Sequence, residues 1–186
     1  MKAYLTIIIM GTGIILAIAG MLCPYFNYSY LYALFTPLLT ISVMLIDAIG
    51  AIIIRKLPEK WFDSSKKIFI SKPNERKFYE KIGIKKWKDK IPELGGFTNF
   101  HKDKIYDPKS PTYIKQFILE CNYGSMIHLV TGILGYLIIF ITPLDICFLM
   151  AIPVATVNLI LNLLPYFVLR YNVSRLQTML RFISRK

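Results

Sequence analysis

The sequence predicts an all-α integral membrane protein, with four transmembrane helices as two hairpins and a basic, aromatic-rich cytoplasmic segment between helices 2 and 3. Hydrophobic residues make up 55% of the 186 positions, and the mean hydropathy of +0.49 is high for a soluble domain. Four apolar runs reach the length of about 20 residues that crosses the hydrocarbon core. Of the 23 Lys and Arg residues, 17 lie between Arg55 and Lys115. We therefore interpret residues 1–186 as a single membrane domain.

The apolar runs place the spans at about 4–22, 31–54, 124–141 and 146–169. The first run lacks a small-residue cleavage site, so we interpret it as a helix and not as a signal peptide. The two short connections, at 23–30 and 142–145, contain no Lys or Arg and should face outward by the positive-inside rule. The loop 55–123, the tail 170–186 and both termini should then be cytoplasmic. We expect a multi-pass protein of a bacterial-type cell (plasma) membrane.

The loop 55–123 has far more aromatic residues than a disordered linker carries. Ten of them are Trp61, Phe62, Phe69, Phe78, Tyr79, Trp87, Phe97, Phe100, Tyr106 and Tyr113. A helix is expected from about Ser71 to Lys90, where Ile91-Pro92 ends it. A second helix should begin at Ser110-Pro111-Thr112, since proline suits a first helical position, and run through Glu120 into the third span.

The three cysteines and the net charge of +12 exclude several functional classes. Cys23, Cys121 and Cys147 are far apart, without a C-x-x-C pair, so neither a disulfide framework nor a metal site is expected. A basic block is also typical of nucleic-acid binding, but between two membrane spans it favours anionic headgroups or phosphorylated substrates. We expect membrane lipids as partners, with no nucleic acid, metal or cofactor.

Polar residues within three of the spans are the first candidates for function, because such residues are costly in hydrocarbon and tend to be kept for function. His128 lies about one turn inside the third span, and histidine titrates nearest neutral pH. Asp47 precedes Arg55 by eight residues, and Asn162 precedes Arg170 by eight, which places both ~12 Å below a basic helix end. The alternatives are that Asn162, with Asn158 one turn before it, only bonds across helices, and that Asp47 is the partner of a buried cation or a protonated packing group.

Glu120 precedes His128 by eight residues on the same expected helix, so the two share a broad face without direct contact. A titratable pair near the inner face of a membrane indicates chemistry on a lipid-like molecule. The competing interpretations are that Glu120 is a solvated interfacial charge and that His128 serves packing. For the lysines at 85, 86, 88 and 90, the competing interpretation is a face that only binds headgroups, as such lysine clusters most often do.

Three stretches together carry a family resemblance. Residues 84–92 read IKKWKDKIP, residues 120–128 read ECNYGSMIH, and residues 170–176 read RYNVSRL after a span with an Asn and a Pro. In this order they resemble the small membrane acyltransferases of the glycosyl-4,4'-diaponeurosporenoate acyltransferase family. Two positions depart from the family pattern: Ser125 stands where an acidic residue is expected, and Leu129 where a Trp often follows the histidine.

The resemblance implies an enzyme that acts last in making staphyloxanthin-type carotenoids, by esterifying a sugar hydroxyl with a fatty acyl chain. His128 would then be the general base, and Glu120 would hold its tautomer or stabilise the imidazolium. We expect direct attack by the acceptor hydroxyl. The substrate-binding candidates are Lys85, Lys86, Trp87, Lys88, Arg170, Asn172, Arg175, Asp47 and Asn162.

The substrates follow from the same interpretation. The donor would be acyl-CoA, an acyl-carrier protein or a phospholipid, and the acceptor a lipid or glycolipid at the cytoplasmic leaflet, with a glycosylated carotenoid as one candidate. Transfer of another lipid group is a second enzymatic hypothesis. A non-enzymatic membrane subunit, a lipid-binding adaptor or a transporter element is the alternative from a different class, in which the polar residues and the basic loop serve packing, lipid recognition or ion passage.

Overall fold

The computed structural model describes residues 2–91 and 106–184, and every regular element in these two ranges is a helix. Four helices are long and apolar enough to cross a membrane, at Leu5–Tyr25, Tyr30–Arg55, Pro111–Ile141 and Ala151–Ile183. The all-α class and the multi-pass membrane character are thereby confirmed. The two-hairpin arrangement and the sidedness of the middle segment remain predictions. The expected helix stop at Pro92 and the aromatic residues Phe97 and Phe100 lie outside the described residues.

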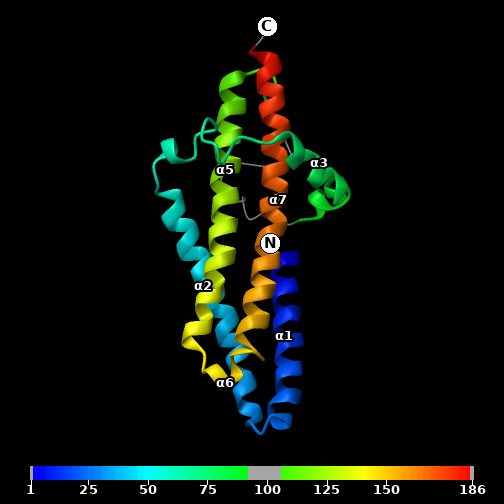
Figure 1. Cartoon of the computed structure of the whole chain (residues 1–186), viewed down its shortest axis with the longest axis vertical. Helices are drawn as coiled ribbons and strands as arrows, with labels where there is room; N and C mark the ends of the chain where they lie inside the picture. The colour runs from blue at the N-terminus through cyan, green and yellow to red at the C-terminus, as the bar shows by residue number, and fades with distance from the viewer. Residues whose placement is uncertain (1, 92–105, 185–186) are drawn as a thin grey trace. The chain divides into compact units, whose positions relative to one another are not determined.

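Figure 1 labels the main helices in the order of the chain. Their bounds are α1 Lys2–Tyr25, η1 Tyr30–Leu34, α2 Phe35–Arg55, η2 Glu59–Trp61, α3 Pro73–Lys81, α4 Ile84–Trp87, η3 Lys88–Lys90, α5 Pro111–Leu134, η5 Gly135–Ile141, α6 Leu144–Cys147 and α7 Ala151–Ile183. As expected, α5 begins at Pro111 and continues through Glu120. Ser110 caps it, since the Tyr113 amide donates to the Ser110 hydroxyl at 3.3 Å.

The fourth span differs from its expected limits at both ends. It begins at Ala151 and not at 146, because the short helix α6 occupies the preceding residues. It also continues to Ile183, so the expected tail from 170 is mostly the last four turns of α7. The sequence after Leu169 holds no Gly or Pro that would end a helix, and apolar residues keep recurring at helical spacing.

The contacts divide the chain into two compact units. Unit 1 comprises Met1–Ile52 and Leu129–Leu163, and unit 2 comprises Ile53–His128 and Leu164–Lys186. The core of unit 1 consists of buried, mostly small or branched apolar side chains from α1, η1, α2, η5, α6 and α7, with Met150 just before α7. They are Ala19, Cys23, Ala33, Leu39, Val43, Ile138, Ile146, Cys147, Met150, Ala151, Val154 and Ala155.

Glycines bring two helical segments of unit 1 into close contact. A Cβ added at Gly135 would lie 2.6 Å from Asn158 Nδ2, and one at Gly132 would lie 3.0 Å from the Asn162 Cβ. At such distances an added side chain would displace its neighbours, so the end of α5 and the start of η5 pack directly against the Asn158 and Asn162 side chains of α7. Small residues at the contact are typical of helix packing in membranes.

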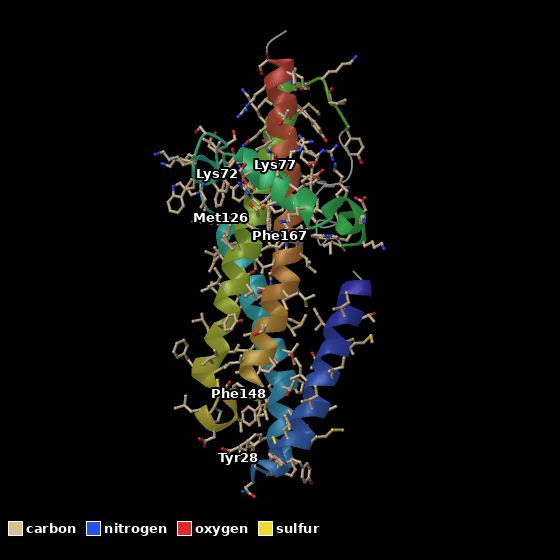
Figure 2. The ribbon with its side chains drawn as sticks, turned by 45° about the vertical axis from the view of Figure 1, so that its right-hand side comes forward. Tyr28, Lys72, Lys77, Met126, Phe148 and Phe167 are labelled. Atoms are coloured by element: carbon tan, nitrogen blue, oxygen red, sulfur yellow. The ribbon has the colours of Figure 1, made fainter. Side chains whose placement is uncertain are left out.

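Two apolar clusters among the described residues of unit 2 pack against α7. Along α5, the side chains of Ile114, Phe117, Ile118 and Cys121 follow helical spacing and pack against Leu169, Val173 and Leu176 of α7. In the second cluster, Tyr79 of α3 and Ile84 of α4 pack against Val168 and Tyr171 of α7. Figure 2 shows Phe167 where α7 passes α3, and its ring centroid is 6.2 Å from that of Phe78.

The helix expected from about Ser71 to Lys90 is present but interrupted. Gly83 has φ 69° and follows the end of α3. This left-handed conformation is the usual one for a glycine just past a helix end. The chain therefore turns between α3 and α4, which directs the buried Ile84 side chain into the second cluster of unit 2.

Candidate functional site

A buried ion pair joins α3 to α7 in unit 2. Arg170 Nε donates to Glu75 Oε1 at 2.8 Å, and Arg170 Nη2 donates to Glu75 Oε2 at 2.9 Å. The Tyr79 hydroxyl donates to the same Oε1 at 3.1 Å, and burial together with this carboxylate raises the pKa of Tyr79. Arg170 is only 5% exposed. Its guanidinium is thus held inside the protein by Glu75, which lies within the helix expected from about Ser71 to Lys90.

A second contact fixes the backbone that precedes α3. The side-chain amide of Gln177 donates from Nε2 to the Phe69 carbonyl at 3.0 Å and accepts from the Ser71 amide at 3.0 Å. Arg170 Nη1 also reaches the Phe69 carbonyl, at 3.4 Å. Two side chains of α7 therefore hold residues 69–71, and the position of α3 follows from them.

Glu120 is paired with a residue from the end of α2. Arg55 Nη1 lies 2.7 Å from Glu120 Oε2, and the Arg55 guanidinium stands over the Tyr123 ring, 5.2 Å from its centroid. The Tyr123 hydroxyl donates to the Leu57 carbonyl at 2.8 Å. The pair is partly exposed, and it ties the segment after α2 to the middle of α5.

The same part of α5 also holds the chain around Phe62, in the segment that follows α2. Asn122 Nδ2 donates to the Phe62 carbonyl at 2.8 Å, and the Phe62 ring stacks on Tyr123 at a centroid distance of 4.0 Å. Asn122 is fully buried. Asn122 and Tyr123 were not predicted as site residues, although both lie within the 120–128 stretch that carries the family resemblance.

His128 is half-buried on α5. It follows Glu120 by eight residues, which corresponds to a rise of ~12 Å along the helix. The structure therefore places the two proposed catalytic residues on one helix at different depths, with the Glu120 carboxylate bound by Arg55.

Unit 2 contains a cavity of about 560 Å³, a volume in the range of small-molecule sites. Its lining residues are Arg76, Lys88, Pro108, Phe117, Asn172, Arg175, Leu176, Thr178, Met179, Phe182 and Ile183. Three of them are cations, none of these lining residues is a carboxylate, and most of the others are apolar. We call it the basic cavity. It brings together the predicted residues Lys88, Asn172 and Arg175, and it adds Arg76, which the sequence did not single out.

Of the six predicted binding residues that do not line the basic cavity, three belong to α4. Lys85 Nζ lies 3.1 Å from Glu80 Oε1, and the pKa of Glu80 is lowered, chiefly by the hydrogen bond from Lys85. Lys86 is exposed. The Trp87 indole donates to the Ile82 carbonyl at 3.2 Å, and its ring packs beside the cluster around Ile84.

The polar residues predicted in the second and fourth spans meet in unit 1. Asn162 Nδ2 donates to Asp47 Oδ2 at 3.1 Å, and Asn158 Nδ2 donates to Asp47 Oδ1 at 3.4 Å. The Thr131 hydroxyl donates to Asn162 Oδ1 at 3.4 Å. Asp47 and Asn162 are therefore brought together, as their equal depth suggested, and they are bonded to each other.

Comparison with models of known protein families gives a match. The model of the glycosyl-4,4'-diaponeurosporenoate acyltransferase family matches residues 58–182, which include the middle segment, α5, and α7 up to Phe182. No curated protein and no solved structure matches the chain. All residues that line the basic cavity, except Ile183, fall within the matched range.

Proposed function

The chain belongs to the glycosyl-4,4'-diaponeurosporenoate acyltransferase family, and we propose that it moves a fatty acyl chain to a hydroxyl of a lipid-linked glycosyl acceptor at the cytoplasmic leaflet. Membership in the family implies an acyltransferase of carotenoid biosynthesis. A glycosylated carotenoid is the acceptor that we favour. The observation that carries the proposal is the basic cavity, because it combines cations with an apolar wall as an acyl donor requires.

The cations of the basic cavity suit the phosphates of a donor such as acyl-CoA, acyl-carrier protein or a phospholipid. Arg76 is 3.4 Å from Glu80, and Lys88 pairs with its neighbour Asp89. Exposed ion pairs of this kind contribute ~0–1 kcal/mol, so a phosphate can replace the carboxylates. Arg175 lies over the Tyr171 ring, 5.8 Å from its centroid, which orients its guanidinium.

Arg170 takes a positioning role in this proposal. Its buried pair with Glu75 fixes the start of α3, and Arg76 is the next residue along that helix. Neutralisation by Glu75 inside the protein leaves Arg170 poorly suited to bind a donor phosphate directly. Lys85 and Lys86 then lie at the surface, and Trp87 contributes to the packing around α4. The mutual hydrogen bonds of Asp47 and Asn162 likewise favour a packing role within unit 1.

The proposed reaction is a direct acyl transfer with His128 as general base. The imidazole removes the proton of the acceptor hydroxyl while that oxygen attacks the acyl carbonyl. The tetrahedral intermediate then collapses, the bond to the carrier breaks, and the imidazolium returns its proton to the leaving thiolate or alkoxide. The product is an ester, and His128 ends as it began. Glu120 is bound by Arg55, so we assign it an indirect part in the reaction, namely holding the segment after α2 against α5.

The burial of the neighbouring nucleophiles supports direct attack. Cys121 is fully buried in the core between α5 and α7. Ser125 is buried too, and its hydroxyl donates to the Asn122 carbonyl at 2.9 Å. Phe117 of the basic cavity and His128 are eleven residues apart, or ~16 Å along α5. An extended donor can therefore hold its phosphate in the cavity while its carbonyl lies near His128.

The test is product formation by the purified protein in proteoliposomes. A glycosylated carotenoid and an isotope-labelled acyl donor are supplied, and mass spectrometry measures the ester. The three donor classes are compared in parallel, with empty vesicles as the control. Labelled ester that depends on the protein supports the proposal. Absence of ester with all three donors would overturn it and favour the non-enzymatic alternative.

A further inference from the structure

The proposed base and the basic cavity lie on one face of α5. Phe117 lines the cavity, and His128 follows it by eleven residues, which is about three full turns of an α-helix. Phe117, Cys121, Gly124 and His128 form a continuous stripe, because their spacings of four, three and four residues keep them on one side of the helix. The stripe covers ~16 Å along the helix axis. A donor held in the cavity must bridge that distance to bring its carbonyl to His128.

The neighbouring helix gives a similar distance. In unit 2, α5 and α7 run side by side in opposite directions (Figure 1), and a Cβ added at Gly124 would lie 2.8 Å from Leu169 Cδ1. His128 is four residues further along α5, so its level corresponds to that of Pro165, four residues back along α7. Arg175 of the cavity lies ten residues beyond Pro165, or ~15 Å along α7.

The path from the cavity to His128 runs along the edge of the contact between α5 and α7. Leu169 packs on Gly124, so a ligand cannot pass between the two helices at that level. Pro165 and Asn172 are seven residues apart and share one face of α7, and Asn172 lines the cavity. His128 is only half-buried, so a carbonyl can reach its imidazole from this edge. This geometry favours a narrow, extended linker between phosphate and carbonyl.

The donor classes differ in the length of that linker. In a phosphopantetheine thioester, about 14 bonds separate the phosphorus from the acyl carbonyl carbon, and an extended chain advances ~1.1–1.2 Å per bond, which gives ~16 Å. In a diacyl phospholipid, about 5 or 6 bonds separate the phosphorus from an ester carbonyl, which gives ~6–7 Å. A phospholipid with its phosphate in the basic cavity would leave its carbonyl ~10 Å short of His128.

The lining of the basic cavity suits a phosphopantetheine linker as well as its phosphate. The three cations can bind the phosphate through charge-assisted hydrogen bonds. The apolar side chains of Phe117 and Met179 can pack on the branched dimethyl group of the linker. Asn172 carries a side-chain amide, the group that pairs with the peptide-like amides of the linker.

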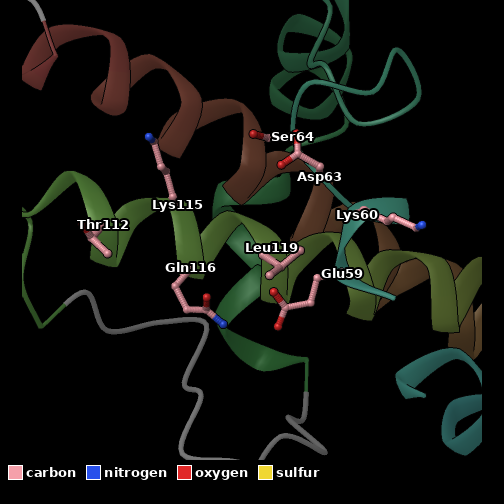
Figure 3. Close-up of a pocket in the computed structure, with 8 residues that line it drawn as sticks. All are labelled: Glu59, Lys60, Asp63, Ser64, Thr112, Lys115, Gln116 and Leu119. Carbon is pink, nitrogen blue, oxygen red and sulfur yellow. The ribbon is translucent and has the colours of Figure 1, made fainter. Parts of the chain in front are cut away.

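Another cavity of unit 2 does not meet these requirements. Its volume is about 540 Å³, and Figure 3 shows its lining residues, among which are the carboxylates of Glu59 and Asp63. Hydrogen bonds from Ser65 lower the pKa of Asp63, so this carboxylate is ionised near neutral pH and repels a phosphate. Leu119 of this cavity follows Phe117 by two residues and so faces the opposite side of α5. A donor bound there would be directed away from the base.

We propose that the acyl donor is a phosphopantetheine thioester, with its phosphate bound in the basic cavity and its carbonyl at His128. This inference rests on the proposed function and selects one donor chemistry for it. The acceptor oxygen attacks the thioester carbonyl and gives its proton to the imidazole. The carbon–sulfur bond then breaks, and the imidazolium protonates the thiolate, so the products are the ester and a free thiol. Acyl-CoA and an acyl-carrier protein share this chemistry.

Binding can be tested without turnover, by protection of an introduced cysteine in the detergent-solubilised protein. Thr178→Cys places a thiol in the lining of the basic cavity, and Lys77→Cys, exposed on α3, is the matched control. The ligands are S-methyl phosphopantetheine and S-methyl pantetheine, which differ only in the phosphate and do not react with maleimide. We expect only the phosphorylated ligand to slow maleimide labelling of Thr178→Cys, and neither ligand to affect Lys77→Cys. Equal protection by both ligands, or by neither, would overturn the assignment.

A kinetic cycle connects the phosphate to the cavity. Ester formation is measured with acyl-phosphopantetheine and acyl-pantetheine for the unmodified protein, Arg175→Gln and Arg181→Gln. Arg181 is an exposed arginine of the same helix that does not line the cavity. Removal of the phosphate should raise KM about tenfold in the unmodified protein and in Arg181→Gln, because a charge-assisted hydrogen bond is lost. The increase should be smaller in Arg175→Gln. An equal increase in all three proteins would overturn the assignment.

The choice of donors separates this inference from the proposed function. Acyl-CoA, acyl-carrier protein and a phospholipid with the same labelled acyl chain are supplied in separate reactions. Ester from a thioester and none from the phospholipid would sustain the inference, and the more efficient thioester identifies the source of the phosphopantetheine. Ester from the phospholipid alone would overturn the inference and sustain acyl transfer. Protection of Thr178→Cys by the phosphorylated ligand, without ester from any donor, would sustain the phosphopantetheine site and overturn acyl transfer.

Discussion

Arg170 of α7 and Glu75 of α3 face each other through two parallel hydrogen bonds of 2.8 and 2.9 Å, although 95 residues separate them in the chain. Both side chains are largely buried, and Tyr79 donates to the same carboxylate. This pair, with Gln177, holds the start of α3 against α7 and so fixes the neighbouring Arg76 at the basic cavity.

Glu75→Gln should destabilise the protein by ~3 kcal/mol, because it leaves the buried Arg170 guanidinium without its counter-charge. Replacing both residues by Leu should cost less than the sum of the two single Leu variants, since neither charge is then left unpaired. Thermal unfolding in detergent gives the four values of the cycle. Additive effects within ~0.5 kcal/mol would show that the pair is not coupled.

Ionisation of the Tyr79 hydroxyl should make the stability of the folded protein depend on pH in the alkaline range. Burial and the Glu75 carboxylate raise its pKa in the folded state above the ordinary value near 10. A group with a raised folded pKa contributes stability below its unfolded pKa and loses that contribution as the pH rises toward the folded value. The unfolding temperature should therefore fall above pH 10 by more in the unmodified protein than in Tyr79→Phe. Identical pH profiles would contradict the shift.

The predicted sidedness can be checked by cysteine labelling in intact cells. A cysteine at Asn27, in the exposed turn after α1, should react with an impermeant maleimide from outside. A cysteine at Lys77, exposed on α3, should react only after permeabilisation. The native Cys23, Cys121 and Cys147 are buried and give a low background. The reverse pattern would place the basic segment outside and remove the cytoplasmic site.

His128→Ala should lower turnover ~10²–10⁴-fold, the usual contribution of a positioned general base. The fold should persist, since the change removes a polar group from an otherwise apolar part of the helix. Glu120→Gln should cost less, because Glu120 is two turns away and bound to Arg55. The assay is ester formation in proteoliposomes, with thermal unfolding as the control. A stable and fully active His128→Ala protein would exclude the histidine as the base.

Substitutions of two neighbouring lysines should have different effects, because only one of them lines the basic cavity. Lys88 lines the cavity, whereas Lys86 does not. Lys88→Gln should raise KM for a phosphate-bearing donor about tenfold, which corresponds to a loss of ~1.4 kcal/mol in binding. Lys86→Gln should only weaken binding to anionic vesicles, by ~1 kcal/mol. Equal effects of the two variants on KM would mean that the lysines act through the membrane surface.

The sequence alone was sufficient to predict the helices whose positions depend on local residue patterns. Four apolar runs predict four membrane-crossing helices because each backbone polar group must be satisfied within its own helix in hydrocarbon. Pro111 predicts where α5 begins, and the expected helix after Ser71 is present as α3 and α4. The limits of α7 were less predictable, since no local residue type distinguishes a helix that ends at the membrane surface from one that continues to Ile183.

The pairings of the charged residues were decided by the tertiary structure. From the sequence, Glu120 could be matched only with His128 on its own helix, but in the fold it binds Arg55, 65 residues away. Arg170 directly follows the fourth apolar run, where the sequence predicts an exposed cation. In the fold it is buried against Glu75. Composition and periodicity fix which residues are helical and which faces are apolar. The rotation of each helix and the path of residues 55–91 determine which charges meet, and both follow from packing between distant segments.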